Sequence, residues 1–104
     1  MTDPYRPLYP WQPTWPGETG LDGKPLQDFV GIDRGEHIGR IRLEIGGPMG
    51  GKWQWSGQGP VRIPKRILPH QGYCATAREA SRMVEDYYHR LMWHNGLRGS
   101  EDVE

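Results

Sequence analysis

Residues 76–95 constrain the fold most, because their pattern has the period of an α-helix. Thr76 and Glu79 have the spacing of a capping box, in which each side chain satisfies a backbone N–H group at the helix start. Asn95-Gly96 is expected to end the helix with a residue in the left-handed conformation. Apolar residues then recur at helical spacing: Ala77, Ala80, Met83, Val84, Tyr87 and Leu91. The opposite, polar side is predicted to carry Arg78, Arg82, Glu85, Asp86, His89 and Arg90. This amphipathic helix of about five turns needs an apolar surface to cover.

The middle of the chain supplies that surface as alternating strands. One predicted strand places Ile41, Leu43 and Ile45 on one face and Arg40, Arg42 and Glu44 on the other. After a glycine-rich turn, Trp53 and Trp55 alternate with polar residues, so the two segments read as an antiparallel hairpin with both tryptophans facing the helix. Shorter strands are expected at residues 28–32 and 72–75, and an edge strand at residues 61–63 between prolines.

These elements predict an α+β fold, in which a three- or four-stranded antiparallel sheet packs on one C-terminal amphipathic helix. Residues 1–25 are expected to form a Pro/aromatic-rich arm and loop, residues 26–96 a single domain, and residues 97–104 a flexible acidic tail.

The arm has a regular sequence, with a proline at every third position from Pro4 to Pro16. This spacing matches the three residues per turn of polyproline II and predicts an extended N-terminal arm. Its aromatic residues include Tyr5, Tyr9, Trp11 and Trp15. Two interpretations stay open: the rings pack on the protein's own domain, or they form a ligand for an aromatic groove on a partner.

The zero net charge hides a segregated pattern. Residues 40–82 carry eight basic and two acidic side chains, a net of +6, whereas residues 1–39 and 83–104 each carry a net of −3. A basic centre between acidic flanks is typical of a polyanion-binding surface, or of charge balanced within one fold.

Few residues point to a reaction. The single Cys74 excludes an internal disulfide and a cysteine-based zinc cluster, and a cysteine before a helix is either a reactive thiol or a small buried hydrophobe. The turn GGPMGGKW resembles a phosphate-binding loop, but Trp53 replaces the required Ser/Thr and a strand follows in place of a helix. The four histidines lack ligand spacing. We therefore expect a protein without enzymatic activity, cofactor or bound metal. The absence of a long apolar run predicts a cytoplasmic protein with no membrane contact.

The polar face of the predicted hairpin is the main candidate site. Arg40, Arg42 and Lys52 are expected to project together, with Gln54 between them. Arg62, Lys65 and Arg66 are expected nearby. Basic side chains on a sheet can neutralise phosphates, while Gln and Arg can reach base edges.

The Trp-x-Trp strand, the glycine-led last strand and Thr-x-x-Glu-Ala at the helix start together carry a resemblance. Residues 40–91 resemble the arm-binding domain of tyrosine-recombinase integrases and the plant ethylene-response-factor DNA-binding domain. The resemblance implies three strands on one helix, with the sheet contacting DNA. The sequence thus predicts a small binding module that contacts nucleic acid through its basic sheet face. The alternative is a protein–protein adaptor or inhibitor that acts through Tyr5, Tyr9, Trp11 and Trp15 or through the helix surface.

Overall fold

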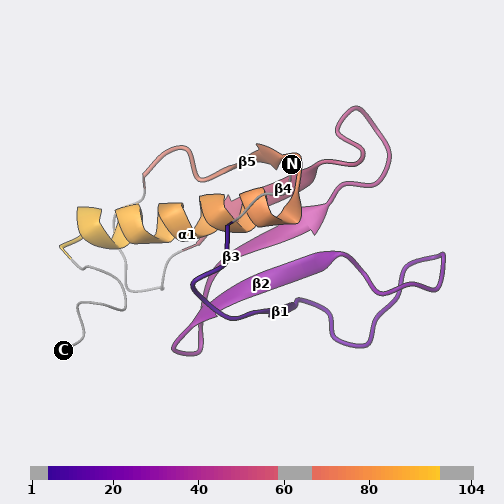
Figure 1. Cartoon of the computed structure of the whole chain (residues 1–104), viewed down its shortest axis with the longest axis horizontal. Helices are drawn as coiled ribbons and strands as arrows, with labels where there is room; N and C mark the ends of the chain where they lie inside the picture. Colours follow the sequence, from indigo (N-terminus) through magenta and orange to yellow (C-terminus); the bar gives the residue numbers. More distant parts are fainter. Residues whose placement is uncertain (1–4, 59–66, 97–104) are drawn as a thin grey trace.

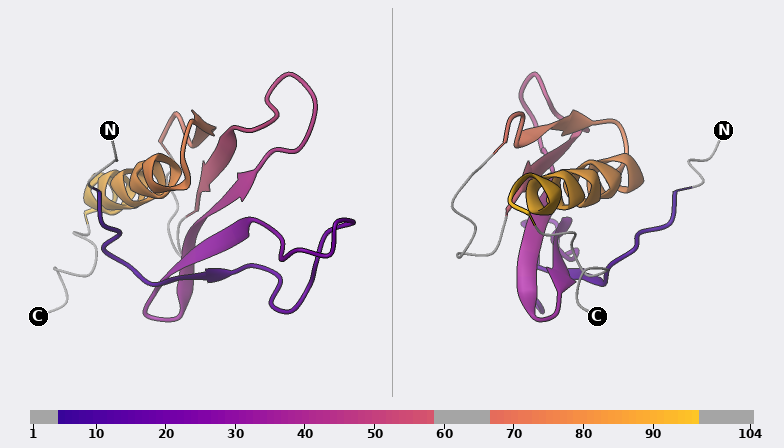
Figure 2. Two further views of the ribbon diagram at one scale, coloured as in Figure 1. Left: turned by 45° about the vertical axis from the view of Figure 1, so that its right-hand side comes forward. Right: turned by 90° about the vertical axis from the view of Figure 1, so that its left-hand side faces the viewer.

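A five-stranded antiparallel sheet covered on one face by one helix makes up the computed structural model, which describes residues 5–58 and 67–96 (Figure 1). In chain order the elements are β1 (Trp11–Pro13), β2 (Asp28–Asp33), β3 (Glu36–Leu43), β4 (Trp53–Gly57), β5 (Gln71–Cys74) and α1 (Ala77–His94). The strands lie side by side in sequence order, and Figure 2 shows α1 crossing one face of the sheet. The predicted α+β class is confirmed, whereas the described residues form five strands and not three or four.

The additional strand is β1, which lies within the segment predicted as a polyproline II arm. Trp11 pairs with Gly31 and Pro13 with Phe29, so β1 is an edge strand of the sheet. The Ile32 N–H group donates to the carbonyl of Pro10 at 2.9 Å. Proline has no N–H group to donate, and is therefore tolerated only where a strand has one neighbour.

The hairpin between β3 and β4 follows the prediction, with Ile41 opposite Trp55 and Leu43 opposite Trp53. Its glycine-rich turn is followed by a strand, as expected, and Gly46 and Gly51 have the positive φ angles that favour glycine. The expectation for Ile45 is wrong, because β3 ends at Leu43 and the Ile45 side chain is 87% exposed.

Helix α1 begins with the Thr76 half of the predicted capping box, whereas the Glu79 carboxylate contacts the Thr76 hydroxyl in place of the Thr76 N–H group. The Thr76 hydroxyl accepts from the Glu79 N–H group at 3.1 Å and donates to the Glu79 carboxylate at 3.3 Å. At the other end, Asn95 has a φ of −96° and Gly96 a φ of +82°, so the left-handed residue is the glycine. Placing the left-handed stop on Gly96 agrees with its lack of a Cβ atom.

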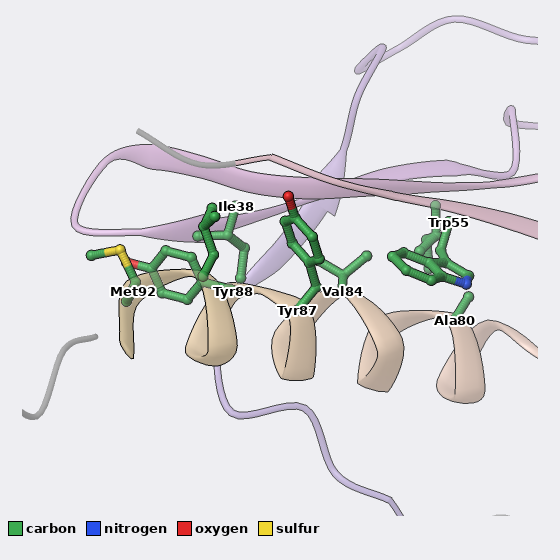
Figure 3. Close-up of a cluster of buried hydrophobic side chains, with 9 residues drawn as sticks. Ile38, Trp55, Ala80, Val84, Tyr87, Tyr88 and Met92 are labelled. Atoms are coloured by element: carbon green, nitrogen blue, oxygen red, sulfur yellow. The ribbon is translucent and has the colours of Figure 1, made fainter. Parts of the chain in front are cut away.

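The core lies between α1 and the near face of the sheet (Figure 3). Its buried members are Ile38, Ile41, Trp55, Ala80, Val84, Tyr87, Tyr88, Leu91 and Met92. Trp55 is 2% exposed, and Trp53 packs against this cluster while stacking on Phe29, so both tryptophans face the helix as predicted.

Two glycines let the helix approach the sheet closely. A Cβ atom at Gly39 would collide with Val84, and one at Gly57 would collide with the Tyr87 ring. The Tyr87 ring therefore rests directly on the backbone of β4.

Several predictions concern residues outside the described ranges, namely the strand at 61–63, the tail at 97–104, and the basic residues Arg62, Lys65 and Arg66. Within residues 5–58 and 67–96, no helix combines the length and the apolar character that crossing a membrane requires.

Candidate functional site

The face of the sheet opposite α1 carries a polar groove of about 410 Å³. Alternation along β3, β4 and β5 directs every second side chain to this open face. The groove is lined by Arg40, Arg42, Gln54, Ser56 and Gln71. Sequence alternation thus correctly placed Arg40, Arg42 and Gln54 together, and the same alternation extended to Ser56 and Gln71 would have identified the remaining two.

Arg40 is held at the groove by an acid on the neighbouring strand. Its guanidinium makes two hydrogen bonds to the Asp28 carboxylate, one of them from Nε at 2.7 Å, and the Thr14 hydroxyl donates to the same carboxylate at 2.7 Å. Burial alone would raise the pKa of Asp28, but the hydrogen bonds from Arg40 and Thr14 outweigh it and lower that pKa. The Trp15 ring lies 5.9 Å from the guanidinium carbon of Arg40, a cation–π distance.

Arg42 is fixed by two other neighbours. Its Nε donates to the Gln54 side-chain carbonyl at 2.8 Å, and its Nη1 lies 3.0 Å from the Glu44 carboxylate. Within the described part of the chain, the Gln54 amide nitrogen, the Ser56 hydroxyl and the Gln71 amide have no protein partner. These polar groups are therefore available to a ligand in the groove.

Lys52 lies one residue before β4 and is exposed, but it does not line the groove. On this face, Arg40, Arg42 and Lys52 lie with two acids, Asp28 and Glu44. Alternation predicted Glu44 on the same face as Arg42, but it did not indicate the pairing of Asp28 with Arg40. Cross-strand partners follow from the register of pairing, which a single strand pattern does not specify.

Three of the N-terminal aromatic residues, Tyr5, Tyr9 and Trp11, converge on one buried carboxylate, Glu85 of α1. Glu85 accepts hydrogen bonds from the Tyr5 hydroxyl, from the Leu8 N–H group at 3.0 Å, from the Tyr9 N–H group at 3.2 Å and from the Trp11 indole at 3.0 Å. Its side chain is 0% exposed, so the prediction that Glu85 lies on the solvated side of the helix is wrong. A buried charge requires such partners, because burial without them is costly.

Neighbouring contacts reinforce this arrangement. The Tyr9 hydroxyl lies 2.7 Å from His89 Nε2, and Arg78 donates to the Tyr5 carbonyl at 2.7 Å. Burial and the hydrogen bond to Glu85 raise the pKa of Tyr5, so its hydroxyl stays protonated and able to donate. Of the four predicted partner-binding aromatics, Tyr5, Tyr9 and Trp11 contact α1, whereas Trp15 faces the open sheet.

Two observations on the described residues concern metal binding and Cys74. Residues 5–58 and 67–96 contain no group of three or more His, Cys, Asp or Glu side chains that could hold a metal ion. Burial, together with the Glu79 charge, raises the pKa of the Cys74 thiol, which disfavours the reactive thiolate. Cys74 packs against the core, as a small hydrophobe would.

Comparison with known proteins returned no matching family model, no matching curated protein and no matching solved structure. The resemblance to the integrase and ethylene-response-factor domains therefore stays a prediction.

Proposed function

We propose that this protein binds nucleic acid through the open face of its sheet. The observation that carries the proposal is the groove, where two arginines converge with three uncharged polar side chains. Arginine N–H groups suit phosphate oxygens and guanine edges, and Gln amides suit adenine edges. A nucleic acid, which carries phosphates and base edges together, would use all of these donors and acceptors.

The arginines are pre-positioned for this role. Asp28 orients Arg40, while Gln54 and Glu44 orient Arg42, so less side-chain entropy is lost when a ligand binds. Each arginine has five N–H donors, and these contacts use only some of them. Arg40, Arg42 and Lys52 are the basic residues of this face, and the paired acids Asp28 and Glu44 reduce its net charge to +1. We therefore expect binding with a shallow salt dependence, since few phosphates are neutralised.

In this proposal the Pro-rich N-terminal arm serves the fold. Its contacts with Glu85 and His89 are made within the chain, so a partner could take Tyr5, Tyr9 or Trp11 only by detaching the segment. The adaptor alternative has less support for that reason.

The test is fluorescence anisotropy with labelled duplex DNA, single-stranded DNA and RNA, at about 50 and about 200 mM salt. We expect binding to at least one of these that weakens in Arg42→Gln. Arg90→Gln, which changes an exposed arginine on α1, is the matched control. Failure to bind any of the three ligands at the lower salt would rule the proposal out.

A further inference from the structure

Two exposed aromatic rings flank the groove. Trp15 is 47% exposed and lies over Arg40, on the side of the groove nearest β1. Tyr73 is 42% exposed and lies on β5, opposite Gln54 of β4. Since Gln71 of β5 lines the groove, Tyr73, two residues further along the same strand, points to the same open face.

The width of the sheet argues against a duplex ligand. Three-stranded sheets that read duplex DNA enter the major groove, which is about 12 Å wide. Five strands spaced about 4.8 Å apart span about 19 Å from β1 to β5. In addition, the polar residues line a hollow, and the Trp15 ring borders it at Arg40.

The charges point the same way. Tight duplex binding commonly rests on many phosphate contacts from unpaired Lys and Arg side chains. Here Asp28 and Glu44 pair with the two arginines of the groove. Exposed rings beside a few fixed polar groups instead match the way proteins bind unpaired bases, by stacking and by hydrogen bonds to base edges.

We propose that the ligand of this face is a single-stranded nucleic acid, whose bases stack on Trp15 and Tyr73 while the backbone or base edges contact Arg42, Gln54 and Gln71. This inference rests on the proposed nucleic-acid function and specifies its substrate class. Trp15 and Tyr73 are the stacking residues, and Arg40 positions the Trp15 ring.

The experiment compares full-length protein binding to a fluorescein-labelled single strand of about 15 nucleotides, to the same strand annealed to its complement, and to the RNA of the same sequence. We expect the DNA or RNA single strand to bind at least about tenfold tighter than the duplex. Trp15→Ala and Tyr73→Ala should each weaken single-strand binding by about five- to tenfold, consistent with the loss of one stacked base. Trp15→Phe, which keeps an aromatic ring, should restore most of the affinity.

Trp93→Ala is the control, because Trp93 is an exposed tryptophan on α1, the element that packs on the opposite face of the sheet. It should bind like the parent protein, and circular dichroism should show that all variants are folded.

Equal or tighter binding of the duplex would overturn the single-strand inference while leaving the proposed function standing. Parent-like affinity in both alanine variants would overturn the stacking roles. Absence of binding to all three ligands would remove the proposed function and this inference together.

Discussion

Replacing Glu85 by alanine tests the arrangement that joins the N-terminal segment to α1. The carboxylate accepts from four groups, and we expect the backbone N–H groups of the exposed Leu8 and the half-buried Tyr9 to bond to water once it is gone. The half-buried Tyr5 hydroxyl and Trp11 indole are less easily hydrated. A hydrogen bond to a charged acceptor contributes about 1.5–3 kcal/mol. Removing the buried charge also removes its desolvation cost, so we count only the bonds from Tyr5 and Trp11, each at the lower value. We therefore expect the free energy of unfolding to fall by about 3 kcal/mol.

Urea denaturation followed by tryptophan fluorescence measures this loss. With a slope of about 1.5 kcal/mol per molar urea, the midpoint of Glu85→Ala should fall by about 2 M. Asp86→Ala is the matched control, because it removes an exposed carboxylate one residue further along the same helix and should change stability by less than about 0.5 kcal/mol. Equal midpoints for the two variants, together with Leu8 and Tyr9 amides of the parent that exchange with solvent as fast as unprotected ones, would contradict a stabilising role of Glu85.

Further perturbations test other parts of the structure. Thr76→Ala should lower the free energy of unfolding by about 1 kcal/mol, because Glu79 N–H loses its acceptor; an unchanged denaturation midpoint would contradict the cap. Trp55→Ala should cost about 3–5 kcal/mol, and a variant that keeps its full near-UV circular dichroism would show that the ring is not in the core. Deleting residues 1–16 should lower the melting temperature, because it removes β1 and the donors to Glu85. The packing of this segment on the domain would be contradicted by an unchanged melting temperature together with NMR data that show residues 1–16 of the parent as mobile. The pKa of Asp28 is lower in the folded protein than in the unfolded chain. The ionised carboxylate therefore stabilises the fold at pH values above about 4, the ordinary pKa of an aspartate, and this stabilisation is lost as the pH falls below that value. The parent should therefore be more stable than Asp28→Asn at pH 7, and the gap should close in acid; a gap independent of pH would refute this linkage.

The sequence predicted those parts of the fold whose signals are local. The Thr76 cap and the period of α1 depend on residues within a few positions of one another, and so does the alternation that placed Arg40, Arg42 and Gln54 on one face. Strand β1 was not predicted, because proline spacing suits polyproline II and an edge strand equally well.

The buried role of Glu85 could not be read from helical periodicity either. A glutamate among polar neighbours is typical of a solvated face, and its partners come from a segment nearly eighty positions away. Likewise, the pairing of Arg40 with Asp28 depends on the register between β2 and β3, which the alternation of one strand does not define.

The bonds to Glu85 also set an order of events during synthesis. Tyr5 and Glu85 are separated by 80 positions, so a ribosome adding about 5–20 residues per second makes the carboxylate roughly 4–16 s after the tyrosine. During that interval the donors of the N-terminal segment have no acceptor on α1, and the tyrosine and tryptophan rings are open to other chains. A message truncated before α1 would therefore yield a product with its aromatic N-terminal segment exposed, which chaperones and proteases could recognise. The N-terminal segment can therefore pack on Glu85 only after α1 has been synthesised.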